Sequence, residues 1–248
     1  MGMQASIVKV FPICFFRTGL RVLFILAMAC MLLACGTALA GFSGQAEAAA
    51  GSAPRPAPKL MIFGDSLVAG YGLRAEDSFP AQLAAVLKDQ GNAVTIINAG
   101  VSGDTTAGGR ARLDWALADA PDAVILVLGG NDALRGLPPS AMRENLVAIL
   151  ERMTADGLPV LIAGMRAPRN MGSDYAADFD AAFSAAVATI RSRQQAALLF
   201  YPFFLEGVAL EPTLNQSDGI HPNAAGVAEI VRRMLPQIQQ LLELSKTS

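Results

Sequence analysis

The chain has 248 residues, of which 53% are apolar and 16% charged, with a formal net charge of −2, three cysteines and one histidine. This length suits one domain, or two small ones, with enough apolar material for a core. All three cysteines lie within the first 35 residues, which excludes a disulfide scaffold, a cysteine-based metal site and a cysteine nucleophile from the remainder. One histidine excludes sites that need several. If the chain uses a histidine base, that base is His221.

The first 40 residues have the pattern of an export signal. Basic residues without an acidic one precede an uncharged apolar run at 22–35, and Ala38-Leu39-Ala40 fits the A-x-A cleavage pattern. Two alternatives stay open. The sequence LLACG resembles a lipobox with Cys35 as the lipidated residue of a membrane-anchored lipoprotein, and residues 22–40 are long enough to form an uncleaved anchor. All three interpretations predict an exported protein, periplasmic or extracellular, with membrane contact only through this segment.

Residues 41–58 are rich in Ala, Gly, Ser and Pro without periodicity, which predicts a flexible linker before a domain at 59–248. The first 58 residues hold four of the 19 basic residues and one of the 21 acidic residues, which leaves the domain a net charge of −5. A negative domain without a run of Lys or Arg argues against nucleic acid or anionic lipid as its partner. We therefore expect a small-molecule substrate and a monomeric protein.

Five short apolar runs alternate with longer segments in the domain, and they are typical of strands buried on both faces of a parallel sheet. The runs are 60–63, 94–98, 123–128, 160–163 and 197–201. Apolar residues of helical period lie between them, as at Phe179, Phe183, Val187 and Ile190. The last helix is predicted to start near Asn223, with Pro236 kinking or splitting it.

This alternation predicts an α/β fold: a doubly wound, three-layer α/β/α sandwich with a five-stranded parallel sheet, flavodoxin-like in architecture. Ligands in such sheets bind at the carboxyl ends of the strands. Polar motifs follow three of the predicted strands at those ends, and a fourth lies near the end of the chain. They are Gly64-Asp65-Ser66-Leu67, the segment 98–105, Gly129-Gly130-Asn131-Asp132 and Asp218-Gly219-Ile220-His221.

Each motif alone is typical of a turn or a helix cap. Together they predict a hydrolytic site, because a serine hydroxyl needs a neighbouring base to take its proton. His221 is the sole imidazole, and its ordinary pKa near 6.5 suits proton transfer at neutral pH. Asp218 lies three residues before His221, close enough in a turn to accept from Nδ1–H and to leave Nε2 for Ser66. Three N–H donors for the oxyanion are expected: the Ser66 backbone, the Gly103 backbone and the Asn131 side chain.

The motif set resembles the GDSL, or SGNH, hydrolase superfamily, whose marker Ser, Gly, Asn and His fall on Ser66, Gly103, Asn131 and His221. The resemblance covers essentially the whole domain and implies the same oxyanion hole of Ser66, Gly103 and Asn131. Three segments resemble the branch of secreted bacterial thioesterase I, lysophospholipase and arylesterase proteins. They are 98–113, 125–137 and 217–223. The resemblance thus implies a serine esterase that hydrolyses acyl esters or thioesters, without a metal or an organic cofactor.

The polar neighbours of these motifs have structural interpretations. We expect Asp65 and Asp132 to be buried carboxylates that bind nearby backbone amides. Asp104 and Thr105 are expected to cap a helix or hold a turn, and Arg135 to be a solvated loop residue.

Further residues are assigned to packing or to the walls of the cleft. Trp115, Phe203 and Phe204 are predicted to pack in the core. The segments 133–138 and 165–175 are expected to wall the cleft, since loops at strand ends carry specificity.

Two other functions stay open at this point. One is a carbohydrate O-acetylesterase of the same fold. The other is a non-catalytic envelope binding protein on a flavodoxin-like scaffold. No G-x-G-x-x-G or P-loop pattern follows the first strand, so nucleotide or flavin binding is not expected.

Overall fold

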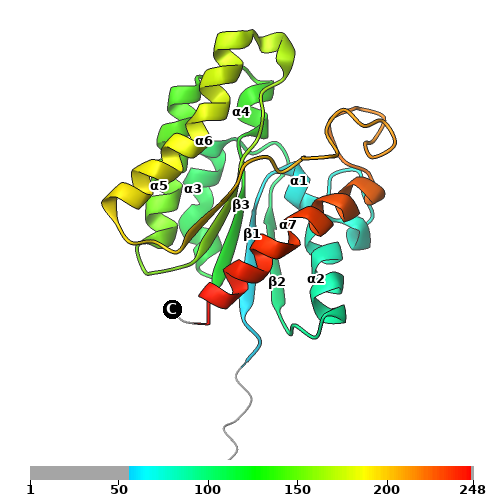
Figure 1. Ribbon diagram of the computed structural model, residues 1–248, viewed down its shortest axis with the longest axis vertical. Coiled ribbons are helices and arrows are strands. Elements are labelled where there is room, and N and C mark those ends of the chain that lie inside the picture. The colour runs from blue at the N-terminus through cyan, green and yellow to red at the C-terminus, as the bar shows by residue number, and fades with distance from the viewer. Residues whose placement is uncertain (1–55, 247–248) are drawn as a thin grey trace, which may run out of the picture. The chain divides into compact units, whose positions relative to one another are not determined.

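A five-stranded parallel sheet forms the centre of the computed structural model, which describes residues 56–246 (Figure 1). The strands are β1 Lys59–Gly64, β2 Thr95–Gly100, β3 Ala123–Val127, β4 Val160–Ala163 and β5 Leu198–Tyr201. Their order across the sheet is β2-β1-β3-β4-β5. In this register Ile62 of β1 lies between Asn98 of β2 and Ile125 of β3. Each predicted apolar run is a strand; the run at 160–163 matches β4 at both ends, and the bounds of the other four differ by one or two residues.

The apolar runs become strands because both faces of the inner sheet are covered by helices. Every residue of β3 and β4 is buried, and so is β1 apart from Lys59. The edge strands β2 and β5 are only partly buried. The uninterrupted apolar character of the inner strands therefore reports their position in the sheet as well as their conformation.

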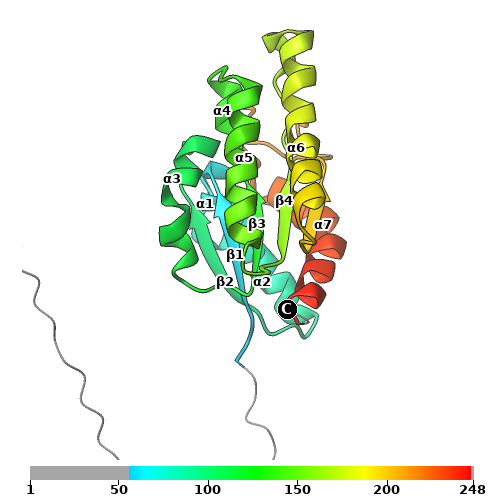
Figure 2. The ribbon, with the colours of Figure 1, turned by 90° about the vertical axis from the view of Figure 1, so that its left-hand side faces the viewer.

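Helices cover the two faces of the sheet, with α3, α5 and α6 on one side and α2 and α7 on the other (Figures 1 and 2). The α-helices are α1 Ser66–Ala69, α2 Phe79–Asp89, α3 Thr106–Leu117, α4 Gly130–Leu134, α5 Pro139–Thr154, α6 Ser173–Arg193 and α7 Ala224–Leu244. Two 3₁₀ turns, η1 Ala75–Asp77 and η2 Arg169–Met171, complete the elements. The predicted three-layer α/β/α sandwich is confirmed.

The strand order reverses between β1 and β3, because the chain steps from β1 to β2 on one side and then crosses back to β3. Connections that leave two neighbouring strands in opposite directions open a crevice at their carboxyl ends, where ligands of such folds bind. The motifs after β1, β2 and β3 all reach this reversal point.

The expectation for Trp115 is wrong, and one of the two outcomes predicted for Pro236, a split helix, is not found. Trp115 is 79% exposed, because the buried stripe of α3 runs through Gly109, Leu113 and Ala116 and leaves Trp115 off it. Phe204 is buried, and Phe203 is half-buried beneath the Arg166 guanidinium. Pro236 does not split the last helix.

Helix α7 runs through Pro236 as one element. Proline removes one backbone donor from a helix and usually ends or bends it. Here Ile230 and Met234 before the proline, and Ile238 and Leu241 after it, are all buried on one face. That continuous apolar face keeps both halves packed on the sheet layer.

Among residues 56–246, no helix is both long enough and apolar enough to cross a bilayer. The predicted targeting segment at 1–40 and residues 41–55 of the predicted linker lie outside the described residues. Export, lipidation at Cys35 and membrane anchoring therefore stay predictions.

Candidate active site

Ser66 is the first residue of α1 and follows directly on β1. Gly64 makes the tight strand-to-helix turn possible, because a Cβ there would lie 2.5 Å from the Val127 carbonyl oxygen and from a methyl of Val68. Asp65 caps the helix, accepting from the Leu67 backbone N–H at 3.0 Å. The turn thereby presents the Ser66 hydroxyl at the carboxyl edge of the sheet.

Asp218 and His221 lie in one loop that is closed by backbone pairing. The Gln216 N–H donates to the His221 carbonyl at 2.7 Å, and Asn215 pairs with Pro222 in an antiparallel bridge. Within the loop, one oxygen of Asp218 accepts from the backbone N–H of Ile220 at 2.9 Å and of His221 at 3.0 Å. The Asp218 carboxylate is thus oriented by its own loop.

The three side chains form a continuous hydrogen-bonded chain. Ser66 Oγ lies 2.9 Å from His221 Nε2, and His221 Nδ1 lies 2.6 Å from Asp218 Oδ2. Partial burial raises the pKa of Asp218. Hydrogen bonds from the backbone and ring of His221 and from the backbone of Ile220 lower it by more, so the net pKa is about 2. An ionised Asp218 accepts a hydrogen bond from Nδ1–H, so Nε2 is left to accept from the serine hydroxyl. This arrangement can activate Ser66 as a nucleophile.

The three expected oxyanion donors follow the carboxyl ends of neighbouring strands. The backbone N–H groups of Ser66 and Gly103 have no acceptor within residues 56–246. Gly103 adopts a φ of +84°, a conformation that L side chains rarely adopt, and the nearest atom to a Cβ there would be Nη2 of Arg135 at 3.6 Å. Glycine therefore suits this position for two reasons. It adopts the positive φ, and it has no Cβ to keep a substrate acyl group away from its N–H, as expected from the sequence.

Asn131, at the start of α4, is held by two acceptors. Its Nδ2 donates to the Asp104 carbonyl at 2.9 Å and to Oδ2 of Asp65 at 3.3 Å. Sequence reasoning treated this amide as a free donor, whereas the structure shows both of its hydrogens directed at protein oxygens. The bond to Asp65 is the longer and weaker of the two, so its hydrogen has the greater capacity to be shared with a substrate oxygen.

Known proteins share the sequence motifs of this site. A family model described as "GDSL-like Lipase/Acylhydrolase family" matches residues 62–228, which include the serine, the glycine, the asparagine and the Asp-His loop. The chain belongs to this family.

Two curated proteins and one solved structure support this family assignment for the chain. It is 38% identical over 187 residues to Esterase TesA of Pseudomonas aeruginosa, covering 75% of this chain and 90% of that one. It is 39% identical over 188 residues to thioesterase 1/protease 1/lysophospholipase L1 of Escherichia coli K12, covering 75% and 86%. The crystal structure of AlinE4, described as an SGNH-hydrolase family esterase, superposes with a TM-score of 0.61 at 42% identity, covering 75% and 97%.

The structural interpretations of the neighbouring polar residues agree with the geometry. Asp65 is 1% exposed, and its burial raises the carboxyl pKa to about 6. Asp132 is buried and accepts from the backbone N–H of Thr106 at 2.8 Å and its hydroxyl at 2.6 Å. Thr105 caps α3 by accepting from Gly108 N–H at 3.2 Å. Asp104 differs, since its carboxylate pairs with the half-buried Arg112 at 2.6 Å.

Two residues of the GDSL site have roles that sequence reasoning missed. The Tyr71 ring lies 4.8 Å from the His221 ring, centroid to centroid, and so packs beside the imidazole. Arg135, expected to be merely solvated, donates from Nη2 to the Gly103 carbonyl at 2.6 Å. No local pattern announces either contact, because each joins segments far apart in the chain.

The two segments expected to wall the cleft contact each other. Tyr175, in the first turn of α6, donates from its hydroxyl to the Leu137 carbonyl at 2.9 Å. Exposed apolar side chains lie close in sequence to each site residue. These are Tyr71, Val101, Leu134 and Ile220, between 43% and 55% exposed, and we call them the apolar rim.

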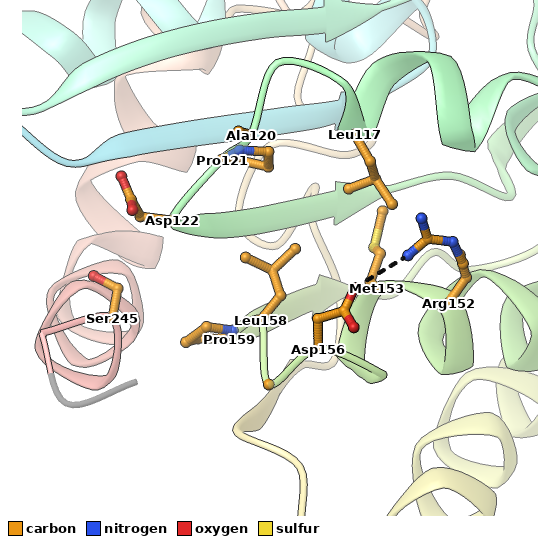
Figure 3. Close-up of a pocket in the computed structure, with 11 residues that line it drawn as sticks. Leu117, Ala120, Pro121, Asp122, Arg152, Met153, Asp156, Leu158, Pro159 and Ser245 are labelled. Carbon is orange, nitrogen blue, oxygen red and sulfur yellow. Dashed lines mark ion pairs between the residues drawn. The ribbon is translucent and has the colours of Figure 1, made fainter. Parts of the chain in front are cut away.

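A cavity of about 320 Å³ lies at the opposite edge of the sheet (Figure 3). Asp122 and Pro159, which precede β3 and β4, line it together with Leu117 and Leu158. None of the candidate site residues lines this cavity. Within the described part of the chain, no group of three or more His, Cys, Asp or Glu side chains is arranged to hold a metal ion.

Proposed function

We propose that this GDSL hydrolase is a serine esterase that cleaves acyl esters and thioesters through Ser66, His221 and Asp218. One observation carries the proposal: the hydrogen-bonded chain from Ser66 Oγ to Asp218 Oδ2 lies at the same sheet edge as the N–H groups of Gly103 and Asn131. A nucleophile, a base, a group orienting the base and oxyanion donors are the parts that acyl transfer needs.

In the first half of the reaction, Ser66 Oγ bonds to the acyl carbon as its proton passes to His221 Nε2. The carbonyl oxygen becomes an oxyanion and takes hydrogen bonds from the N–H groups of Ser66, Gly103 and Asn131. The bond from carbon to the leaving oxygen or sulfur then breaks, and His221 returns the proton to that leaving group. Asp218 stays ionised and stabilises the imidazolium in between.

In the second half, water attacks the acyl-serine and gives its proton to His221 Nε2. The second oxyanion collapses, Ser66 Oγ leaves with that proton, and the carboxylic acid is released. The net reaction is hydrolysis: the bond from the acyl carbon to the leaving oxygen or sulfur is replaced by a bond to the oxygen of water, and Ser66 and His221 return to their starting states.

The apolar rim supports an apolar acyl group as the preferred substrate portion. Its four side chains are exposed and lie within five residues in sequence of Ser66, Gly103, Asn131 or His221, and burying apolar surface against an acyl chain contributes about 25 cal/mol per Å². The names of the relatives, an esterase and a thioesterase 1/protease 1/lysophospholipase L1, are consistent with such substrates. We further propose that the protein acts outside the cytoplasm as a monomer; its export-like N-terminus supports the location.

The deciding experiment compares Ser66→Ala and His221→Ala with the wild type on p-nitrophenyl butyrate and octanoate. Both variants are expected to lose at least about 10³-fold in kcat, because either change removes the activated nucleophile. A fluorophosphonate probe is expected to label the wild type at Ser66 only. The matched control is Ser184→Ala, an exposed serine of α6 whose hydroxyl bonds its own helix. Near-wild-type activity in either site variant would sink the proposal.

A substrate panel separates the remaining alternatives. Hydrolysis of acyl-CoA, lysophospholipid and aryl esters is expected to exceed release of acetate from acetylated polysaccharide. The reverse order, with no activity on acyl chains of six or more carbons, would favour a carbohydrate O-acetylesterase.

A further inference from the structure

A ring of hydrogen bonds joins the nucleophile turn to the loop that carries Gly103. Asn131 Nδ2 donates to both Asp65 and the Asp104 carbonyl. The Asp104 carboxylate accepts from Arg112 Nε at 2.6 Å, and Arg112 Nη2 donates to the Gly64 carbonyl at 2.9 Å. Gly64 precedes Asp65 in the chain, which closes the circuit. We call these five residues the oxyanion ring.

Asp65 does more in this ring than cap a short helix. One of its oxygens accepts from the Leu67 N–H, which is all that an N-cap requires. The other oxygen faces Asn131, the amide expected to bind the oxyanion. Asp65 therefore holds the nucleophile turn with one oxygen and the side-chain donor with the other.

Burial makes Asp65 a poor choice for a purely structural cap. A carboxylate that is 1% exposed is costly to ionise, and its burial raises its pKa to about 6. Serine or asparagine would cap α1 without that cost. A titratable group whose pKa is perturbed by burial, next to a reactive serine, is typical of a functional site.

Arg112 closes the ring from the side of α3. Its guanidinium lies 4.0 Å above the Phe63 ring while bonding both Asp104 and Gly64. Its third nitrogen, Nη1, is buried and has no acceptor among the described residues. A largely buried ion pair with an unsatisfied donor stabilises a fold little more than an apolar pair of the same size would. Its geometric effect is to tie the oxyanion loop to the end of β1.

We propose that Asp65 and Arg112 are positioning residues that hold the Asn131 amide and the Gly103 N–H at the separation an oxyanion requires. The inference rests on the proposed esterase function. Asp65 acts on the amide directly, and Arg112 acts through Asp104, which follows Gly103 and accepts from Asn131. Misplacing a catalytic donor by about 1 Å costs on the order of 10²-fold in rate.

The Asp65 side is tested with Asp65→Asn and Asp65→Ser, each in the wild-type and the Asn131→Ala backgrounds. The asparagine keeps the cap but presents an NH₂ group to Asn131, and the serine keeps the cap but is too short to reach it. We expect each to lower kcat about 10- to 100-fold with KM changed less than about threefold. Because the effect passes through Asn131, neither should cost more than about twofold in the Asn131→Ala background. The same loss in both backgrounds would overturn the Asp65 role.

The Arg112 side is tested with Arg112→Met and Arg112→Lys, and with Arg110→Met as the matched control on the exposed face of α3. Methionine keeps an unbranched apolar side chain beside Phe63 but removes the guanidinium and with it every hydrogen bond to Asp104 and Gly64. We expect Arg112→Met to lower kcat about 10- to 100-fold in protein that remains folded under the assay conditions, although its urea midpoint falls because the Asp104 carboxylate loses its partner. Arg112→Lys, which keeps a charge for Asp104, should recover part of the loss. Unchanged kcat in Arg112→Met, or a loss of rate that only follows a loss of folded protein, would overturn the Arg112 role.

Failure of this inference is distinguishable from failure of the proposed function. Ser66→Ala abolishes turnover if the esterase proposal is right, whatever Asp65 and Arg112 do. If Ser66→Ala is inactive while the ring variants keep full kcat, only the positioning role is refuted.

Discussion

Asp65→Asn is expected to change how the stability of this protein depends on pH. Asp65 is 1% exposed, and burial is the main cause that raises its pKa from 3.8 to about 6. The charge of Asp104 also raises this pKa. Hydrogen bonds from Leu67 and Asn131 and the charge of His221 lower it, but by less. The folded state therefore binds the Asp65 proton more tightly than the unfolded state. The resulting stabilisation is complete below pH 3.8 and is lost as the pH rises through about 6.

The size of this loss follows from the shift. A difference of about two pKa units corresponds to on the order of 3 kcal/mol at 1.36 kcal/mol per unit, and a nearly inaccessible group needs no discount for solvent screening. Asparagine at this position cannot ionise. The free energy of unfolding of Asp65→Asn minus that of the wild type should therefore rise by on the order of 3 kcal/mol between pH 4 and pH 8. The amide facing Asn131 adds a cost of about 1–3 kcal/mol at every pH, which cancels in this comparison.

The assay is urea unfolding followed by circular dichroism at five pH values from 4 to 8. Fluorescence is a poor probe here, because Trp115 is already 79% exposed in the folded state. Asp122→Asn is the matched control, since this exposed carboxylate accepts a backbone N–H from Lys59 at the far edge of the sheet. Its difference from the wild type should not vary with pH in the same way. A difference for Asp65→Asn that is equal at pH 4 and pH 8 would refute the burial argument.

Three further predictions concern the site and the core. Asp218→Asn should lower kcat by about 10³- to 10⁴-fold, because an amide N–H facing His221 Nδ1 favours the tautomer that cannot accept from serine; activity within tenfold of the wild type would contradict the assigned role of Asp218. Tyr71→Ala should lower kcat/KM by about tenfold on p-nitrophenyl butyrate without changing the urea midpoint, since the ring packs beside the imidazole at the surface. Trp115→Ser should change the free energy of unfolding by less than about 0.5 kcal/mol, because that side chain is exposed. Phe183→Ala should lower the free energy of unfolding by about 3–5 kcal/mol, because that side chain is fully buried. Equal effects of the two changes in urea unfolding would contradict this dependence on burial.

The strands and the main helices were predictable from the sequence because their signals are local. An uninterrupted apolar run such as 123–127 has no polar face to present to water, so it needs cover on both sides. The stripe Phe179, Phe183, Val187 and Ile190 repeats at helical spacing and is buried throughout. Trp115 was misassigned because its size was weighed and its place off the buried stripe of α3 was not.

The candidate site divides in the same way. His221 was identified by being the only histidine, and Asp218 by lying three residues before it, within reach of one turn. Tyr71, Arg112 and Arg135 carry no such signal. Their partners are His221, Asp104 and Gly103, and two of these three contacts cross between segments more than 30 residues apart.

The sequence by itself determined the order of strands and helices, the residue types available for acyl transfer and the single base among them. These properties depend on periodicity, composition and short spacings, which are complete within a few residues. Only the tertiary structure decided that the Asn131 amide already has two acceptors, that the second oxygen of Asp65 faces that amide, and that Arg112 joins the oxyanion loop to β1. The physical reason is that burial and hydrogen-bond partners are set by which strand ends the sheet order brings together, and the reversal between β1 and β3 is a property of the folded chain.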